Sequence, residues 1–327
     1  MTTATPDLLA AGTTMGAVTL RVADLDAMTA FYRDAVTLTV LSTGPGRAVL
    51  GRGSTPVVVL EHSPGLAHAG ARQAGLFHTA ILFETEADLA AAVLGVASAH
   101  PGSFTGSADH LVSKAFYFTD PEGNGIELYW DRERTAWSWT HGRIEMASLR
   151  LDPQRFLDEH LDEEAVRQAG ARPASVGHVH LCVGDVATAR HFYVDQLGFA
   201  TTAELGGSAL FVSAGGYHHH MAMNTWTSAG AGRRRRALGL GLVRIALPTA
   251  DDLGALDDRL RHHRVATRDD GRTLSFEDPW ANRIEVSPVA CDPPSRLPSP
   301  PLDTPSTVRD GLDAALLRRP GFAAYPE

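Results

Sequence analysis

The sequence predicts an α+β protein built from four small βαβββ units, on the evidence of two internal repeats and one recurring order of elements. Residues 22–34 match residues 183–195 at an offset of 161, and both stretches read Val-x-Asp before a helix that carries Phe-Tyr. Residues 120–127 match residues 278–285 at an offset of 158, through Asp-Pro, Asn and Ile-Glu. The chain of 327 residues is therefore a tandem duplication in which each half is itself duplicated.

Each unit reads as one strand, a helix and three further strands. In the first unit, strand 18–22 precedes a helix for which Asp24 is the expected N-cap, because its carboxylate accepts from first-turn amides. Clusters such as Gly-Pro-Gly at 44–46 then separate short β-branched runs such as 57–59. The other units run from about 78 to 130, 178 to 226 and 242 to 286.

The predicted organisation has two domains joined by a connector. An acidic, amphipathic pattern predicts a helix over 156–170, and Pro and Ser dominate after Pro288, before a short helix predicted near 312–318. We expect a two-unit N-terminal domain (1–140), a helical connector (141–175), a two-unit C-terminal domain (176–290) and a Pro-rich tail (291–327).

Composition narrows the classes of function. A net charge of −9 argues against nucleic-acid binding, and the run Arg233–Arg236 is interpreted as a solvated loop. Only Cys182 and Cys291 are present, so no disulfide framework is expected. No apolar segment reaches the roughly 20 residues of a membrane helix, and residues 1–16 lack the pattern of a secretory signal. We expect a cytoplasmic protein with no membrane partner; a homo-oligomer is left open.

Three side chains suggest a metal site. His78 and His178 each begin an apolar run, and Glu127 follows a tight Asp-Pro turn at 120–123. Two histidines and one carboxylate are the ligands that mononuclear non-haem iron takes on one face. The same Asp-Pro turn recurs at 278, where no metal is expected, which favours a structural role for the turn itself.

Over residues 16–287 these units resemble the vicinal oxygen chelate superfamily, which includes glyoxalases, antibiotic-resistance proteins and extradiol dioxygenases. The similarity is greatest to two-domain catechol 2,3-dioxygenase-like proteins. The resemblance implies that units pair into two incomplete barrels. It also implies that a metal binds in the cup of a barrel, on ligands from first and last strands.

The four units offer unequal ligands at these positions. Only units two and three together supply two histidines and a carboxylate, so we expect unit two to pair with three, and unit one with four. His180 shares a strand face with His178 and is the alternative to it. The first-strand residues are Ala17, His78, His178 and Leu242 or Val243, and the last-strand carboxylates are Glu127 and Glu285.

The resemblance also implies catalytic residues. An acid/base histidine is expected on the last strand of unit three, where alternation with Met221 and Met223 favours His219 over His220. Tyr117 lies ten residues before Glu127, which is the family spacing of the active-site tyrosine. His110 resembles the substrate-binding histidine, although it lies two residues nearer Tyr117 than its usual counterpart.

The function expected from this set is Fe²⁺-dependent extradiol cleavage of catechol or a substituted catechol by O₂, with Mn²⁺ as an alternative metal. A second hypothesis is a glyoxalase-like isomerase or thiol transferase, but such sites usually carry another carboxylate and lack the acid/base histidine. A third is a metal-free protein that binds a drug or aromatic ligand, a class that generally lacks these three ligands.

Overall fold

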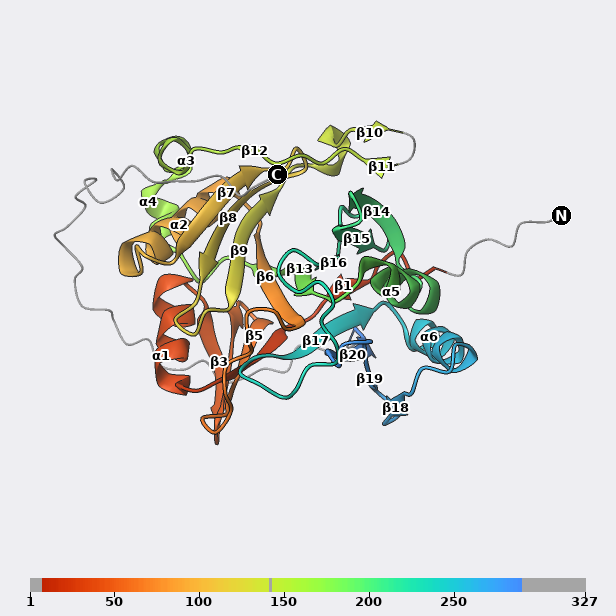
Figure 1. The fold of residues 1–327 in the computed structure, drawn as a ribbon. Coiled ribbons are helices and arrows are strands. Elements are labelled where there is room, and N and C mark those ends of the chain that lie inside the picture. The colour runs from red at the N-terminus through yellow and green to blue at the C-terminus, as the bar shows by residue number, and fades with distance from the viewer. Residues whose placement is uncertain (1–7, 141–142, 290–327) are drawn as a thin grey trace.

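The computed structural model describes residues 8–140 and 143–289, and these form the four predicted βαβββ units (Figure 1). The predicted α+β class is confirmed. The predicted tail, its helix near 312–318 and Cys291 lie outside the described residues. Unit one contains β2 (Val18–Val22), α1 (Leu25–Ala30), η1 (Phe31–Ala35), β3 (Thr39–Gly44), β4 (Arg47–Arg52) and β5 (Thr55–His62). Unit two contains β6 (Gly75–Phe83), α2 (Glu86–Ala99), β7 (Phe104–Asp109), β8 (Ser113–Thr119) and β9 (Gly125–Asp131).

The second half repeats this order. Unit three contains β13 (Ala174–Cys182), α5 (Val186–Arg190), η3 (His191–Gln196), β14 (Ala200–Leu205), β15 (Ala209–Ser213) and β16 (Met221–Asn224). Unit four contains β17 (Gly239–Leu247), α6 (Ala250–His262), β18 (Arg268–Asp269), β19 (Leu274–Glu277) and β20 (Arg283–Pro288). A short strand, β1 (Thr14–Met15), pairs with β17.

All but two of the described strands form two nine-stranded sheets, and each sheet takes one unit from each half of the chain. The inner sheet has the order β12-β7-β8-β9-β6-β13-β16-β15-β14, in which β12 spans Leu149–Arg150. The outer sheet has the order β18-β19-β20-β17-β2-β5-β4-β3, and β1 beside β17 is its ninth strand. Units two and three therefore meet at β6 and β13, and units one and four meet at β2 and β17, as predicted. The domain boundaries at residues 140 and 175 stay a prediction.

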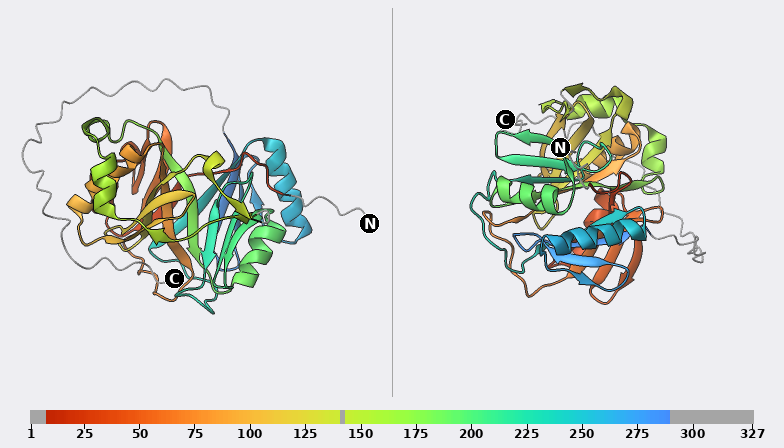
Figure 2. Two further views of the ribbon diagram at one scale, coloured as in Figure 1. Left: turned by 90° about the horizontal axis from the view of Figure 1, so that it is seen from above. Right: turned by 90° about the vertical axis from the view of Figure 1, so that its right-hand side faces the viewer.

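Apolar side chains of the strands and of the helices pack together in a shared core. Leu20 of β2, Ile81 of β6, Val179 of β13 and Val243 of β17 are each at most 1% exposed and share one hydrophobic core. Burial of a side chain of this size contributes about 1.5–3 kcal/mol. Helices α1 and α2 lie on one side of the molecule, and α5 and α6 lie on the other (Figures 1 and 2).

The Asp-Pro turns connect neighbouring units within each half. Asp120 accepts hydrogen bonds from the Asn124 amide and from the Tyr32 hydroxyl of η1, the latter at 3.1 Å. Asp278 accepts the equivalent bond from Tyr193 of η3 at 3.0 Å. The two turns therefore anchor helices, which supports the structural interpretation of this motif.

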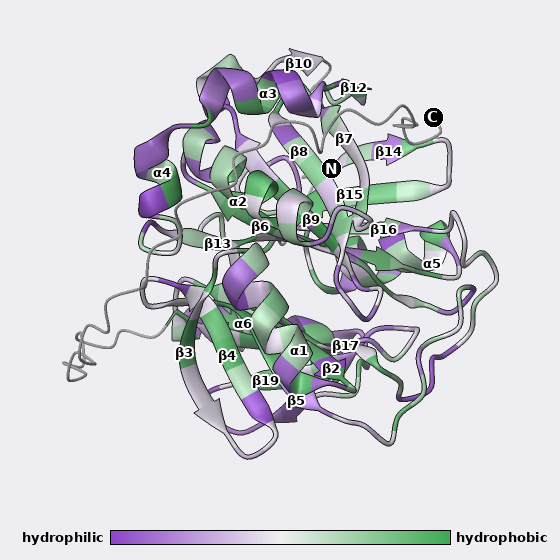
Figure 3. Ribbon diagram, turned by 90° about the vertical axis from the view of Figure 1, so that its left-hand side faces the viewer, coloured by the Kyte–Doolittle hydropathy of each residue, from purple (hydrophilic) through white to green (hydrophobic). Residues whose placement is uncertain are grey.

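The connector differs from its prediction. Before it lie η2 (Arg134–Ala136) and β10 (Trp139–Thr140), which pairs with β11 (Arg143–Ile144). The connector itself contains β11, β12 (Leu149–Arg150), α3 (Pro153–His160) and α4 (Glu163–Arg167). A single helix over 156–170 is wrong, because Asp162 adopts extended backbone and caps the Ala165 amide, which starts a second helix. Figure 3 shows hydrophilic residues, in purple, on the surfaces of α3 and α4. Within the described ranges, no helix is long and apolar enough to cross a membrane.

Candidate metal centre

The candidate centre lies where unit two meets unit three. Strands β6 and β13 run antiparallel, with His180 opposite His78. On the other side of β6, the parallel strand β9 places Glu127 beside Ala80. A register shift between Val176 and His178 alters the strand locally, and all three predicted ligands converge.

Glu127 Oε2 lies 2.9 Å from His78 Nε2 and 3.0 Å from His178 Nε2. The three donor atoms all lie within 4.8 Å of one another, on buried side chains. Neighbouring donors at right angles around an ion, with bonds of about 2.1 Å, are separated by about 3 Å. His78 Nε2 is also buried without a hydrogen bond of good geometry. The donor set therefore fits a divalent metal.

The protonation states suit a metal. Burial alone would raise the pKa of Glu127, but its interactions with His178 and His78 outweigh burial and hold that pKa well below its ordinary value. Burial lowers the pKa of His178 to about 4, against the opposing attraction of Glu127. A carboxylate with neutral imidazoles is the form in which these residues bind a metal.

Gly177 allows His178 to lie where it does. A β-carbon at residue 177 would lie 1.6 Å from the Tyr129 hydroxyl oxygen, so any side chain there would force the phenol or the strand to shift. The Tyr129 ring lies 5.0 Å from the His178 ring, between centroids. The Gly-His pair of the sequence thus reflects the close approach of Tyr129 to β13.

His180, the alternative ligand, is engaged elsewhere. Its Nε2 lies 3.0 Å from the side-chain amide nitrogen of Asn224, which donates to it. Burial lowers the pKa of His180 well below its ordinary value. Among the described residues, the groups of side chains that could hold a metal ion do not include His180. The geometry therefore favours His178.

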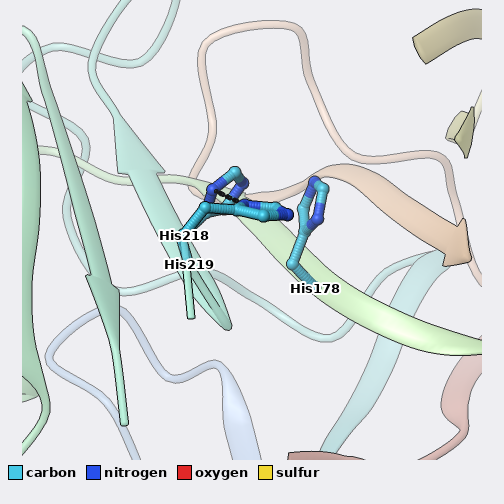
Figure 4. Close-up of side chains that lie close together, drawn as sticks. All are labelled: His178, His218 and His219. Carbon is cyan, nitrogen blue, oxygen red and sulfur yellow. Dashed lines mark hydrogen bonds between the residues drawn. The ribbon is translucent and has the colours of Figure 1, made fainter. Parts of the chain in front are cut away.

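The histidine run does not form the strand that its pattern predicts. β16 begins at Met221, and residues 217–220 lie in irregular backbone before it. The predicted alternation is wrong, because this backbone brings His218 and His219 together, with their Nδ1 atoms 2.7 Å apart. The rings of His178 and His219 lie 4.1 Å apart, and Figure 4 shows all three side chains close together. His219 thus lies beside His178 because of this irregular backbone, and not because of strand alternation.

His220, the alternative acid/base, is directed away from this group. Its Nδ1 accepts a hydrogen bond from the Ala214 amide at 3.2 Å. Burial lowers its pKa to about 3. Its contacts indicate a structural role.

His110 and Tyr117 are hydrogen-bonded to each other. Nδ1 of His110 donates to the Ala147 carbonyl at 2.8 Å, so in the neutral ring Nε2 is the acceptor. The Tyr117 hydroxyl lies 2.7 Å from that Nε2 and donates to it. The Tyr117 ring lies 5.6 Å from the His78 ring, which places the pair beside the candidate metal ligands.

Sequence reasoning missed a polar network on the far side of His219. His218 Nε2 lies 3.0 Å from Asp131 Oδ1, and the Tyr217 hydroxyl donates to Asp131 Oδ2 at 2.7 Å. The Tyr129 hydroxyl lies 2.7 Å from that of Tyr217. The signal available in the sequence was the histidine triplet itself, whereas Asp131 resembles an ordinary strand end.

A group of three histidines shares His178 with the candidate ligand group described above. His178, His218 and His219 also offer nitrogens within 4.8 Å of one another. That group lacks a carboxylate, which would leave the charge of a divalent ion uncompensated in a buried site. Glu127 therefore favours the group with His78.

A family model and a related protein of known name point to the same protein family. Residues 14–128 and 175–286 match the family model described as the Glyoxalase/Bleomycin resistance protein/Dioxygenase superfamily. A catechol-2,3-dioxygenase from Bacillus subtilis (strain 168) is 33% identical over 272 residues, which are 82% of this chain and 94% of that protein.

Solved structures share the fold. One from Bacillus subtilis subsp. subtilis str. 168, described as a candidate dioxygenase, matches with a TM-score of 0.56 and 15% identity, over 84% of each chain. Glyoxalase I from Zea mays matches with a TM-score of 0.50 and 16% identity, over 85% of this chain and 92% of that chain. At these identities the likeness concerns the fold alone.

Proposed function

Because the chain belongs to the Glyoxalase/Bleomycin resistance protein/Dioxygenase superfamily, we propose that it is an extradiol ring-cleavage dioxygenase acting on catechol or a substituted catechol. The observation that carries the proposal is the convergence of His78, Glu127 and His178 on one point in the inner sheet. We propose Fe²⁺ as the metal, with Mn²⁺ as the alternative, because the same ligands accept both.

The proposed reaction opens the ring beside the two hydroxyl groups. Catechol and O₂ combine into a 2-hydroxymuconate semialdehyde-type product, so both oxygen atoms are retained and no further reductant is needed. When bound, the metal supplies Lewis acidity and a redox centre that allow catechol and O₂ to react. His78, Glu127 and His178 would hold the ion, and a site with three protein ligands would leave room for both reactants.

The remaining polar residues are assigned by position. His219 touches the His178 ring and is the proposed acid/base that holds and returns a proton during ring opening. Tyr117 is proposed to hydrogen-bond a substrate oxygen. His110 orients the Tyr117 hydroxyl, since Nδ1 is tied to Ala147 and Nε2 accepts from that hydroxyl.

Aromatic side chains beside the ligands suit a planar substrate. The Phe77 ring lies 4.8 Å from the His180 ring and 5.2 Å from the Trp226 ring. Phe211 lies 5.1 Å from His219, between ring centroids. Such rings favour stacked or edge-to-face contact with another aromatic ring, which supports a catechol over an aliphatic substrate.

The test combines metal analysis with an oxygen-uptake assay. Protein purified without oxygen should contain Fe²⁺ or take it up, consume one O₂ per catechol and form a yellow product. A glyoxalase-like isomerase or thiol transferase would bind metal but consume no O₂. A drug-binding protein would bind an aromatic ligand with neither metal nor turnover. Either result would replace the proposal.

A further inference from the structure

Asp131, His218 and His219 form a continuous hydrogen-bonded chain that ends beside the candidate metal ligands. The links are 3.0 Å from Asp131 Oδ1 to His218 Nε2 and 2.7 Å between the Nδ1 atoms of His218 and His219. His218 is 1% exposed and His219 is 9% exposed, whereas the Asp131 side chain is 17% exposed. The chain thus runs from the edge of the fold into the site.

With both imidazoles neutral, the chemistry of these groups gives every hydrogen bond in the chain one direction. A carboxylate only accepts, so His218 Nε2 carries the hydrogen that it donates to Asp131. In a neutral imidazole the other nitrogen then accepts, so His218 Nδ1 receives the hydrogen of His219 Nδ1. His219 Nε2 is consequently left with a free lone pair. Tyr217 donates to the second oxygen of Asp131, which strengthens the carboxylate as the fixed end of the chain.

This direction matters because a neutral imidazole can take a proton only at its unprotonated nitrogen. A hydrogen bond made by one ring nitrogen decides which nitrogen remains available. Buried partners of this kind orient histidines beside metals and are costly to lose. Without the chain, nothing at Nδ1 would select the tautomer of His219.

We propose that Asp131 is a positioning residue, which acts through His218 to hold His219 in the tautomer with hydrogen on Nδ1 and a free Nε2. The inference deepens the proposed function, on which the acid/base role of His219 rests. The tautomer itself is a property of the chain alone and needs neither metal nor substrate. It can therefore be tested separately.

The decisive readout is ¹⁵N NMR of the metal-free protein labelled at histidine, recorded at a pH where its histidines are neutral. His219 signals are assigned by their absence in His219→Gln. In the wild type we expect a protonated-type shift for Nδ1 and an unprotonated-type shift for Nε2. In Asp131→Asn, the Tyr217 hydroxyl should keep the amide oxygen as its acceptor, which turns the amide nitrogen toward His218 Nε2 as a donor. The chain should then reverse and the two His219 shifts should exchange.

Tyr217→Phe is the matched control. It removes the hydrogen bond to Asp131 Oδ2 and leaves the bond to His218 in place, so the His219 tautomer should not change. In metal-loaded protein, Asp131→Asn should lower kcat about 10-fold or more, with KM and metal content unchanged. Asp131→Glu keeps an acceptor and should recover part of that loss, which a purely structural defect would not.

Hydrogen on Nε2 of His219 in the wild type would overturn the inference, even if Asp131→Asn failed to fold. An unchanged His219 tautomer in folded Asp131→Asn would overturn it as well. Absence of ring cleavage in the wild type would instead refute the proposed function. In that case the NMR result would still decide the role of Asp131.

Discussion

Arg244 and Glu285 are neighbours on the parallel strands β17 and β20, and Arg244 Nε lies 3.5 Å from Glu285 Oε2. Arg283 donates a second contact to the same carboxylate at 3.1 Å. The inner sheet has Ala80 beside Glu127 at the corresponding positions. A guanidinium thus engages the outer carboxylate, whereas the small Ala80 leaves Glu127 to the two histidines. Equivalent strand pairs therefore carry an ion pair in one sheet and a candidate ligand group in the other.

His219→Ala should keep its metal and lose most turnover. A positioned acid or base contributes about 10²–10⁴-fold to rate, and kcat should fall within that range. Metal content and catechol binding, measured beside kcat, should match the wild type. Loss of metal would instead identify His178, His218 and His219 as the ligand group.

Tyr117→Phe should have a smaller effect on kcat/KM. It removes one hydrogen bond of about 0.5–1.5 kcal/mol while keeping the ring, which corresponds to about a 2- to 12-fold loss. Tyr32→Phe is the matched control, because Tyr32 donates to Asp120 in a buried turn between units. The control should lower thermal stability and leave kcat/KM unchanged. An unchanged rate in Tyr117→Phe would make Tyr117 a core residue.

Gly177→Ala should disrupt the inner sheet. Its β-carbon would meet the Tyr129 hydroxyl at 1.6 Å, and overpacking of this kind typically costs about 1–3 kcal/mol. The control is Gly254→Ala on α6, where a β-carbon meets nothing within 4 Å. That variant should gain about 0.5–1 kcal/mol, because alanine favours a helix. Urea unfolding of both variants provides the measurement, and a neutral Gly177→Ala would refute the close approach.

The metal-free protein should lose stability as the pH falls from 6.5 to 4.5. Burial lowers the pKa of His220 to about 3, so the unfolded chain binds its proton near pH 6.5 while the folded chain does not. His178, with a pKa of about 4, contributes in the same direction. Each such histidine adds a slope of at most about 1.4 kcal/mol per pH unit.

His220→Asn isolates this effect. The asparagine side-chain oxygen can accept from the Ala214 amide in place of Nδ1, so the fold should persist. Asp120, whose pKa burial raises to about 6, acts in the opposite direction but is common to both proteins. Urea midpoints across this pH range should fall less steeply in the variant. Parallel pH profiles would show that His220 is not held neutral by the fold.

The sequence predicted the fold and the convergence of His78, Glu127 and His178, because both follow from the repeat. Aligned units place His78 and His178 at equivalent first-strand positions and Glu127 at a last-strand position, and only one pairing of units brings them together. Asp131 could not be predicted in this way, because its role depends on irregular backbone before β16. Period-two alternation holds only within a regular strand, so it could not predict that His218 and His219 meet.

The most direct test of the metal centre compares Glu127→Gln with Glu285→Gln. The two residues occupy equivalent positions in the repeat, so each variant is the control for the other. Iron per chain and oxygen uptake with catechol should be measured for both. We predict that Glu127→Gln loses bound iron and oxygen uptake, and that Glu285→Gln keeps both. Retention of iron by Glu127→Gln, or its loss from Glu285→Gln alone, would contradict a metal site in the inner sheet.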